Sequence, residues 1–395
     1  MPISKKIEDF MTKASFIRRM FEEGIRMKRE LGAENVFDFS LGNPILEPPE
    51  AVLERLAELV RDPPPGLHRY MANAGHPDVC ERIAAYLSEQ SGEKLEAADV
   101  IMTTGAAGAL NTALKSLLDP GDEVVVVAPF FPEYRFYVDN HGGTLVVAES
   151  AGDFDLDIDE LARKVGPRTK ALILNSPNNP TGRTYTAERL AQLGALLAKR
   201  EKASGNPITV LFDDPYHKIV FDGLEAPTIF AAHPNSILIT SHSKDLGLAG
   251  ERIGYAAICP RHADRQALRD AITFANRTLG YVNAPSLFQR VVAETQAASV
   301  PVAVYQELRD LFCDGLERAG YEFLRPQGAF YIFPKSPDPD DVAFVRVLQK
   351  QHILAVPGSG FGRGGYIRLC FCVKRAEIEG ALPGFAAAIE EQRRK

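Results

Sequence analysis

One lysine stands out as a residue that could do covalent chemistry. Lys244 lies in the segment SHSKDLGLAGER, directly after an apolar run, with Ser241 and Ser243 close to it in sequence. Burial near another cation would lower the pKa of this amine and make it a nucleophile, as Schiff-base chemistry requires. Arg252 follows eight residues later in the same segment. An isolated lysine is usually a solvated surface charge, so this interpretation needs support from elsewhere in the chain.

Three further segments carry small or polar residues directly after an apolar run. Residues 103–108 (TTGAAG) could bind a phosphate through the exposed N–H groups of a helix N-terminus, residues 175–182 (NSPNNPTG) place an amide in a tight turn, and residues 213–217 (DDPYH) offer two carboxylates and a tyrosine. Each segment alone is a weak signal, because glycine-rich turns and strand-end aspartates are common structural features. Neither a dinucleotide fingerprint nor a Walker-type loop is present.

The elements that would position these residues alternate from about residue 100 onwards. A helix is predicted from the turn at 105–108, and apolar runs separated mostly by helix-length segments are predicted to be strands. These runs are 101–102, 123–128, 144–148, 170–174, 207–212, 236–240 and 253–258. Continuous apolar strands alternating with helices predict a parallel, doubly wound sheet. Ligands bind beyond the carboxyl ends of such strands, so the four polar segments should converge on one cleft.

The pattern changes after residue 300. A long helix over about 301–319 precedes the aromatic run 330–333, and a second helix is predicted near 340–350. Strands over 353–356 and 366–373 and a last helix over about 375–392 complete the chain. The predicted fold class is therefore α/β: a large domain with a mostly parallel doubly wound sheet flanked by helices, plus a smaller α+β domain.

Bulk properties exclude some functions. The chain has 395 residues and a formal net charge of −7, from 52 acidic and 45 basic residues, which argues against a nucleic acid or an anionic membrane as a partner. The N-terminus MPISKKIEDF does not resemble a signal peptide, and no apolar stretch reaches the length of a membrane span, so we expect a cytoplasmic protein.

The cysteines predict buried thiols rather than a metal site. Five cysteines are scattered along the chain, and no second Cys/His pair accompanies any two of them. Cys370 and Cys372 alternate within an apolar run, so we expect them on the same face of a strand.

Taken together, the motifs resemble the class I aminotransferases, the aspartate-aminotransferase-like branch of the fold-type I pyridoxal-phosphate enzymes. NNPTG, SxSKxxGLxGERxG and YIRLCF occur in the family's order and with its spacing, and the likeness runs from Phe39 to Phe371. The resemblance implies pyridoxal 5′-phosphate as cofactor and a homodimer with shared active sites. It also implies a large cofactor-binding domain over 46–295 and a small domain of 1–45 with 296–395.

The resemblance assigns roles around the cofactor ring. Lys244 would carry the cofactor as an imine and later move the α-proton. Asp213 would pair with the protonated pyridine nitrogen. Asp214 is the alternative, although the spacing to Tyr216 favours Asp213. Tyr216, together with Asn179, would hydrogen-bond to the phenolic oxygen of the cofactor.

Other positions would hold the phosphate. The resemblance places the backbone amides of Ala106 and Ala107 there, together with the side chains of Ser241, Ser243 and Arg252.

Three of the implied roles have plainer alternatives. Phe131, in PFFPEY, would stack on the face of the cofactor, but it could equally belong to the core. Tyr70, in HRYMANAG, would reach the phosphate from the partner subunit, and simple packing is the alternative. An ion pair with Glu251 is the alternative for Arg252.

The substrate α-carboxylate would be bound mainly by Arg368 of YIRLCF, in a bidentate pair assisted by Asn179 and by the backbone of Gly42. Two positions depart from the family pattern. His242 stands where an aromatic or aliphatic residue is usual, and a hydrogen-bonded supporting histidine is favoured over a catalytic one. Asn43 stands where many relatives have glutamate.

The substrate side chain leaves two hypotheses open. Dicarboxylate-specific relatives use an arginine from the partner subunit, and the corresponding stretch 274–286 contains Arg277, about one residue out of register. In the other hypothesis Arg277 is a surface or interface charge, and Tyr281 and Phe16 line a pocket for an apolar or aromatic substrate.

The function implied is an amino-acid:2-oxo-acid aminotransferase with a ping-pong cycle through an imine on Lys244. Within the same fold, a lyase acting at Cβ, such as a carbon–sulfur lyase, uses the same lysine, acid and arginine. A synthase of the aminocyclopropane-carboxylate type is more distant. From a different class, a non-catalytic cofactor-binding regulator is the remaining alternative, although the intact lysine argues against it.

Overall fold

A seven-stranded sheet forms the centre of the larger part of the molecule. The computed structural model describes residues 3–12 and 16–394, with side chains described outside 12–21. Within these residues the strand order is β2-β8-β7-β6-β5-β3-β4. The strands are β2 Val100–Thr103, β3 Glu123–Ala128, β4 Thr144–Glu149, β5 Thr169–Asn175, β6 Thr209–Asp213, β7 Ser236–Ser241 and β8 Gly254–Ile258. All seven predicted runs are therefore strands, with ends that differ by one or two residues.

One strand departs from the predicted parallel arrangement. β8 runs antiparallel to both of its neighbours, β2 and β7, whereas the other neighbours pair in parallel. A parallel connection needs a crossover of a dozen or more residues, usually a helix. The connection from β7 to β8, residues 242–253, contains only the short 3-10 helix Ala249–Glu251, and the chain returns beside β7 in the opposite direction. The sheet is thus mostly parallel, as predicted for the fold class.

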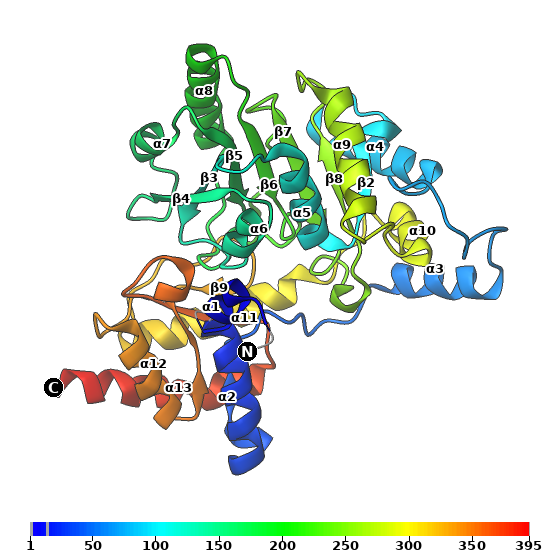
Figure 1. Cartoon of the computed structure of the whole chain (residues 1–395). Coiled ribbons are helices and arrows are strands. Elements are labelled where there is room, and N and C mark those ends of the chain that lie inside the picture. Colours follow the sequence, from blue (N-terminus) through cyan, green and yellow to red (C-terminus); the bar gives the residue numbers. More distant parts are fainter. Residues whose placement is uncertain (1–2, 13–15, 395) are drawn as a thin grey trace.

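Helices cover both faces of the sheet (Figure 1). The helices of this part of the molecule are α3 Glu50–Arg61, α4 Pro77–Ser91, α5 Gly105–Leu117, α6 Tyr134–Asn140, α7 Ile158–Lys164, α8 Ala187–Ser204, α9 Arg265–Thr278 and α10 Ser286–Glu294. In β3, Val124 and Val126 pack into the core beside α5 and α9, whereas Val125 and Val127 pack into the core beside α4 and α8. Successive strand side chains point to opposite faces, so the continuous apolar run is buried on both sides.

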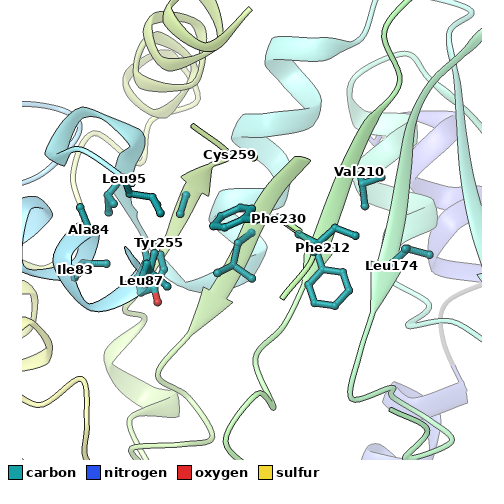
Figure 2. Close-up of a cluster of buried hydrophobic side chains, with 14 of the residues drawn as sticks. Ile83, Ala84, Leu87, Leu95, Leu174, Val210, Phe212, Phe230, Tyr255 and Cys259 are labelled. Carbon is teal, nitrogen blue, oxygen red and sulfur yellow. The ribbon is translucent and has the colours of Figure 1, made fainter. Parts of the chain in front are cut away.

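Figure 2 shows part of the core on the α4 side of the sheet. Ile83 and Leu87 of α4 approach Tyr255 of β8, and Phe212 and Leu174 continue the apolar layer towards β6 and β5.

The smaller part of the molecule lies at the carboxyl ends of the parallel strands (Figure 1). Its helices are α1 Lys5–Thr12, α2 Phe16–Leu31, α11 Val302–Ala319, α12 Asp341–Lys350 and α13 Arg375–Arg393. Its strands form the antiparallel sheet β11-β12-β9 and the parallel pair β1-β10. The bounds are β1 Phe37–Asp38, β9 Tyr331–Ile332, β10 Ile353–Leu354, β11 Val356–Pro357 and β12 Ile367–Cys370. Phe39 contacts Phe312 and Phe385 in its core, so N-terminal and C-terminal segments share one apolar cluster.

Two predicted strands are wrong in detail. The run 353–356 is divided between two sheets, because β10 pairs with β1 and β11 pairs with β12. The run 366–373 ends as a strand at Cys370, where pairing with β9 stops, so Cys372 lies beyond it. All five cysteines are buried and free, as predicted. The core of the larger part extends to Ala293 along the chain, and the core of the smaller part includes Tyr216, Ile219 and Phe221 as well as residues from Val300 onwards.

Among the described residues, no helix is long and apolar enough to cross a membrane.

Candidate active site

A cavity of about 310 Å³ lies where the parallel strands end, between the sheet and the smaller part of the molecule. Twelve of the thirteen residues predicted from the sequence line it: Gly42, Ala106, Ala107, Phe131, Asn179, Asp213, Tyr216, Ser241, Ser243, Lys244, Arg252 and Arg368. The exception, Tyr70, lies elsewhere on the surface. The four polar segments that follow the strands thus meet in one place.

Lys244 follows the end of β7 and projects into this cavity. Its Nζ donates a hydrogen bond to the carbonyl oxygen of Gly42, at 2.7 Å, and lies 5.3 Å from the centre of the Phe330 ring. The amine therefore lies between the sheet and the segment that contains Gly42.

Burial is the main cause that lowers the pKa of Lys244 below its ordinary value. The buried thiols of Cys372 and Cys370 oppose this shift, and the positive charges of Arg252 and Arg368 add to it. An amine with a lowered pKa is more often unprotonated and nucleophilic, which is the property that covalent attachment of an aldehyde requires.

Asp213 is the last residue of β6 and is only 6% exposed. Tyr134 donates to its Oδ2 at 2.5 Å, and Asn175 donates to its backbone carbonyl oxygen at 2.8 Å. Its Oδ1 has no hydrogen-bond partner among the described residues. Burial, together with the charge of Asp214, raises the pKa of Asp213 to about 7, and the Tyr134 hydrogen bond opposes this. A buried, unpaired carboxylate oxygen beside a cavity is suited to a cationic N–H donor.

Asp214 lies on the opposite face of the sheet, because successive strand residues alternate. It is 2% exposed and is hydrogen-bonded at 2.8 Å to Nδ1 of His217. Asp214, His217, His242 and Asp245 line a second cavity, of about 40 Å³, and we call them the rear cluster. His242 contacts Asp245 at 3.2 Å and Gln296 at 3.2 Å, so it is hydrogen-bonded within the protein.

Hydrogen-bond donors gather at the N-terminus of α5, in an arrangement that we call the anion cradle. The N-cap residue, Thr104, makes no side-chain capping hydrogen bond, so N–H groups of the first turn are left for a ligand. Gly105 has φ +74°, and a Cβ there would lie 3.2 Å from Nη2 of Arg252. Arg252, itself at φ +53°, donates from Nη1 to the carbonyl oxygen of Ala249 at 2.9 Å. With the hydroxyls of Ser241 and Ser243, these donors suit a phosphate.

Arg368 of β12 forms the opposite wall of the cavity and is 2% exposed. Nη1 donates to Oδ1 of Asn179 at 3.1 Å, and Nη2 donates to the carbonyl oxygen of Ser40. The guanidinium lies between the rings of Tyr331 and Phe361, 4.7 and 4.8 Å from their centres. Its Nε has no partner among the described residues. A guanidinium fixed in this way presents a planar donor to a carboxylate.

Comparison with known proteins agrees with this geometry. The family model of aminotransferases of class I and II matches residues 34–384. This chain belongs to that family. A solved amino transferase from Eubacterium rectale is 37% identical, with a TM-score of 0.95 and 99% of each chain covered.

Two further comparisons indicate the branch of aminotransferases. A probable aspartate/prephenate aminotransferase of Thermus aquaticus is 30% identical over 359 residues, covering 88% of this chain and 90% of that protein. The solved aspartate aminotransferase of Thermus thermophilus with maleate is 26% identical, with a TM-score of 0.86, and covers 98% of this chain and 100% of that one. The aminotransferase therefore lies in the aspartate-aminotransferase-like branch, as the motifs predicted.

Three residues of interest for this aminotransferase, Tyr70, Tyr281 and Arg277, are not among those that line the cavity of their own chain. Tyr70 is 94% exposed and lines a surface hollow together with Tyr281. Arg277 is exposed at the end of α9, 5.2 Å from the centre of the exposed Phe274 ring. The side chain of Phe16 is outside the described part of the chain.

Three residues of the aminotransferase site were missed by the sequence analysis. Tyr134 binds Asp213, and Oη of Tyr331 lies 3.1 Å from Oη of Tyr216. Asn175 accepts a hydrogen bond from the backbone N–H of Asn179 at 2.6 Å. Tyr134 ends the motif PFFPEY, and Asn175 begins NSPNNPTG, so both were within segments already singled out. Tyr331 had only the aromatic run as a signal.

Proposed function

We propose that this aminotransferase moves an amino group between an L-amino acid and a 2-oxo acid in a ping-pong cycle, with pyridoxal 5′-phosphate bound covalently to Nζ of Lys244. The observation that carries the proposal is the position of Lys244 in one cavity with the unpaired Oδ1 of Asp213, the anion cradle and Arg368. The cofactor would supply an electron sink that stabilises negative charge at the substrate Cα.

The residues of the sheet wall fit the cofactor. The first turn of α5 with Ser241, Ser243 and Arg252 would hold the phosphate. Asp213 would accept a hydrogen bond from the protonated ring nitrogen through its free Oδ1, and Tyr134 would keep its carboxylate oriented.

Two more residues would orient the cofactor ring. Tyr216 and Asn179 would donate to the phenolic oxygen, since both side chains line the cavity. Phe131, partly buried at the cavity wall, would cover one face of the ring.

On the opposite wall, Arg368 would bind the substrate α-carboxylate with the guanidinium edge that includes the unpaired Nε. A Cβ at Gly42 would lie 1.9 Å from Oη of Tyr331, so only glycine allows this close approach of backbone and ring. Once the substrate amine has displaced it, Nζ of Lys244 would take up the proton that leaves the substrate Cα and deliver it to the cofactor carbon on the other side of the amino nitrogen. Its hydrogen bond to the Gly42 carbonyl oxygen supports this role, because Nζ lies beside the segment that would bind the substrate carboxylate.

A homodimer would complete the site. Tyr70 is almost fully exposed, and an exposed tyrosine of this size is stabilised when a second copy covers it. We propose that Tyr70 reaches the phosphate-binding residues of the partner subunit. The chain would act in the cytoplasm, where small amino and oxo acids are available as substrates.

For the substrate side chain, the names of the relatives favour a dicarboxylate. Arg277 is exposed in a single chain, which fits both hypotheses, since burial without a carboxylate would cost several kcal/mol. We propose that it binds the distal carboxylate in the partner's site. Arg277→Ala should then impair aspartate or glutamate while sparing phenylalanine and leucine. Equal effects on all donors, or no effect on any, would rule this role out and leave the pocket for an apolar or aromatic substrate as the alternative.

A single half-reaction separates an aminotransferase from a lyase. The enzyme loaded with pyridoxal phosphate is mixed with an amino acid in the absence of any oxo acid. We expect about one equivalent of oxo acid per site, no ammonia, and turnover only after an oxo acid is added. Continuous release of ammonia would indicate a lyase, and no product at all would indicate a cofactor-binding regulator.

A further inference from the structure

Two thiols meet directly behind the wall that would bind the substrate. Cys370 is the last residue of β12, Cys372 follows two residues later, and their Sγ atoms are 2.9 Å apart. Their exposed fractions are 0% and 2%. The Sγ of Cys372 also donates to the carbonyl oxygen of Asn43, at 3.2 Å. Neither thiol has a role in the proposed transamination.

This pair is connected to the cavity through the segment 40–43. The carbonyl oxygen of Ser40 accepts a hydrogen bond from Arg368, that of Gly42 accepts one from Lys244, and that of Asn43 accepts one from Cys372. β12 carries Arg368 two residues before Cys370. A change at the thiols would therefore affect both the segment 40–43 and β12, which together carry the proposed binding site for the substrate carboxylate.

The two thiols differ in acidity. Burial by itself would raise the pKa of Cys370, but hydrogen bonds from Cys372 and the positive charges of Arg368 and Lys244 lower it below its ordinary value. Burial and the neighbouring Cys370 raise the pKa of Cys372. Cys370 is therefore the more acidic thiol of the pair, and its Sγ lies 2.9 Å from that of the less acidic Cys372, as in oxidant-sensitive dithiols.

The other buried cysteines lack this arrangement. Burial raises the pKa of Cys80 and of Cys313 to about 12, so both stay protonated.

We propose that Cys370 and Cys372 are an oxidative modification site, at which a peroxide forms a disulfide that disables binding of the substrate carboxylate. The Cys370 thiolate attacks one peroxide oxygen, the O–O bond breaks, and the leaving hydroxide takes up a proton to become water. The sulfenic acid on Cys370 is then attacked by the sulfur of Cys372, the S–O bond breaks, and a second water leaves with the thiol proton. Two thiols lose two electrons, and the peroxide is reduced to two waters.

The backbone can accommodate this bond at a cost to the site. Residues two apart in an extended chain have Cα atoms about 6.6 Å apart, near the upper end of the range for disulfides, roughly 4.4–6.8 Å. Closing the bond must pull the end of β12 out of its extended form, and it removes the S–H donor that holds Asn43. We expect kcat/KM to fall by about tenfold or more, since the loss of a net hydrogen bond alone has about this effect.

The experiment uses the holoenzyme treated with hydrogen peroxide. Trypsin releases residues 369–374 (LCFCVK), which contain both thiols and no other cysteine. After treatment, this peptide should resist alkylation by iodoacetamide and regain two alkylated thiols after dithiothreitol. The loss of kcat/KM should be reversed by the same reductant. The disulfide readout is independent of the proposed function, whereas the activity readout rests on it.

Variants distinguish oxidation of Cys370 and Cys372 from oxidation of other residues by peroxide. Cys370→Ser should resist inactivation, whereas the double variant Cys80→Ser/Cys313→Ser should be inactivated and recovered like the wild type. If Cys370→Ser does not fold, the peptide measurement on the wild type still decides. Thiols of residues 369–374 that remain alkylatable, oxidation to sulfinic acid that dithiothreitol does not reverse, or inactivation without a disulfide would each overturn the proposal.

Discussion

The two faces of the sheet at the ends of β6 and β7 carry similar residues in different surroundings. On the cavity face lie Asp213 and Lys244, and on the other face lies the rear cluster. Asp213 and Asp214 are adjacent in sequence and almost equally buried, at 6% and 2% exposure. The cavity carboxylate is bound by a neutral tyrosine, whereas the rear carboxylate is bound by His217, whose pKa is raised mainly by the charge of Asp214.

The difference shows how one strand end can serve both chemistry and structure. A buried carboxylate without a cationic partner is costly, and it persists where a ligand provides the missing charge. The rear carboxylate already has a partner within the protein, His217, whose cationic form it favours. Burial therefore does not distinguish the two aspartates, whereas the nature of the bound partner does. Substitutions on the two faces should have very different effects.

The largest effect is expected on the cavity face, at Lys244. Lys244→Ala removes both the attachment point for the cofactor and the group that moves the proton. A positioned acid–base group alone contributes about 10²–10⁴ to the rate, so turnover should fall by several powers of ten. Lys218→Met, a change beside the rear cluster, is the control and should keep turnover within about tenfold of the wild type. Steady-state rates measure both, and near-normal transamination by Lys244→Ala would refute its role.

The adjacent aspartates provide the sharpest contrast. Asp213→Asn replaces a carboxylate with a neutral amide that cannot stabilise a protonated ring nitrogen, so proton abstraction should slow strongly. Asp214→Asn should have a mild effect on that step, although it can lower the thermal stability because His217 loses its ion pair. Stopped-flow rates of the first half-reaction compare them, and the reverse order of severity would show that the assignment is wrong by one residue.

Substitution of Arg368 tests whether the cavity wall opposite the sheet binds the substrate carboxylate. Truncating one partner of a buried charge pair costs roughly 2–5 kcal/mol, so Arg368→Ala should lower kcat/KM by about 10²–10³ or more for donors and acceptors alike. Arg368→Lys should recover little, because the planar fork is lost. Binding of pyridoxal phosphate should be nearly unchanged in both variants. A loss of cofactor with substrate affinity preserved would place Arg368 in the cofactor site instead.

Replacement of Tyr134 should have the smallest effect, a shift in the pH dependence of cofactor affinity. Its hydrogen bond favours the ionised form of Asp213, so Tyr134→Phe should raise the pKa of that carboxyl above about 7. A hydrogen bond to a charged group is worth about 1.5–3 kcal/mol, or roughly one to two pH units. Cofactor affinity of the apoenzyme should weaken as the pH falls through this pKa. The midpoint should therefore lie at higher pH in Tyr134→Phe, and an unchanged or lower midpoint would rule out this role.

Local patterns in the sequence predicted the sheet and most of the cavity. Lys244 and Asp213 lie in motifs directly after apolar strands, so their place at the strand ends followed from the chain itself, whereas Arg368 was assigned to the site only through the family resemblance. The direction of β8 did not follow, because its apolar run resembles that of a parallel strand. Tyr134 and Tyr331 were missed for a related reason. Their contacts, with Asp213 and with Tyr216, join residues 79 and 115 positions apart. The first depends on how α6 packs against the sheet, and the second on how the two parts of the molecule pack.

The central claim is that Lys244 is the lysine that carries the cofactor. The direct measurement is borohydride reduction of the protein loaded with pyridoxal phosphate, followed by digestion and mass spectrometry of the peptides. We predict a single pyridoxyl group on Lys244, with none on Lys218 beside the rear cluster. Labelling of a lysine other than Lys244, or release of unmodified cofactor after reduction, would contradict the account.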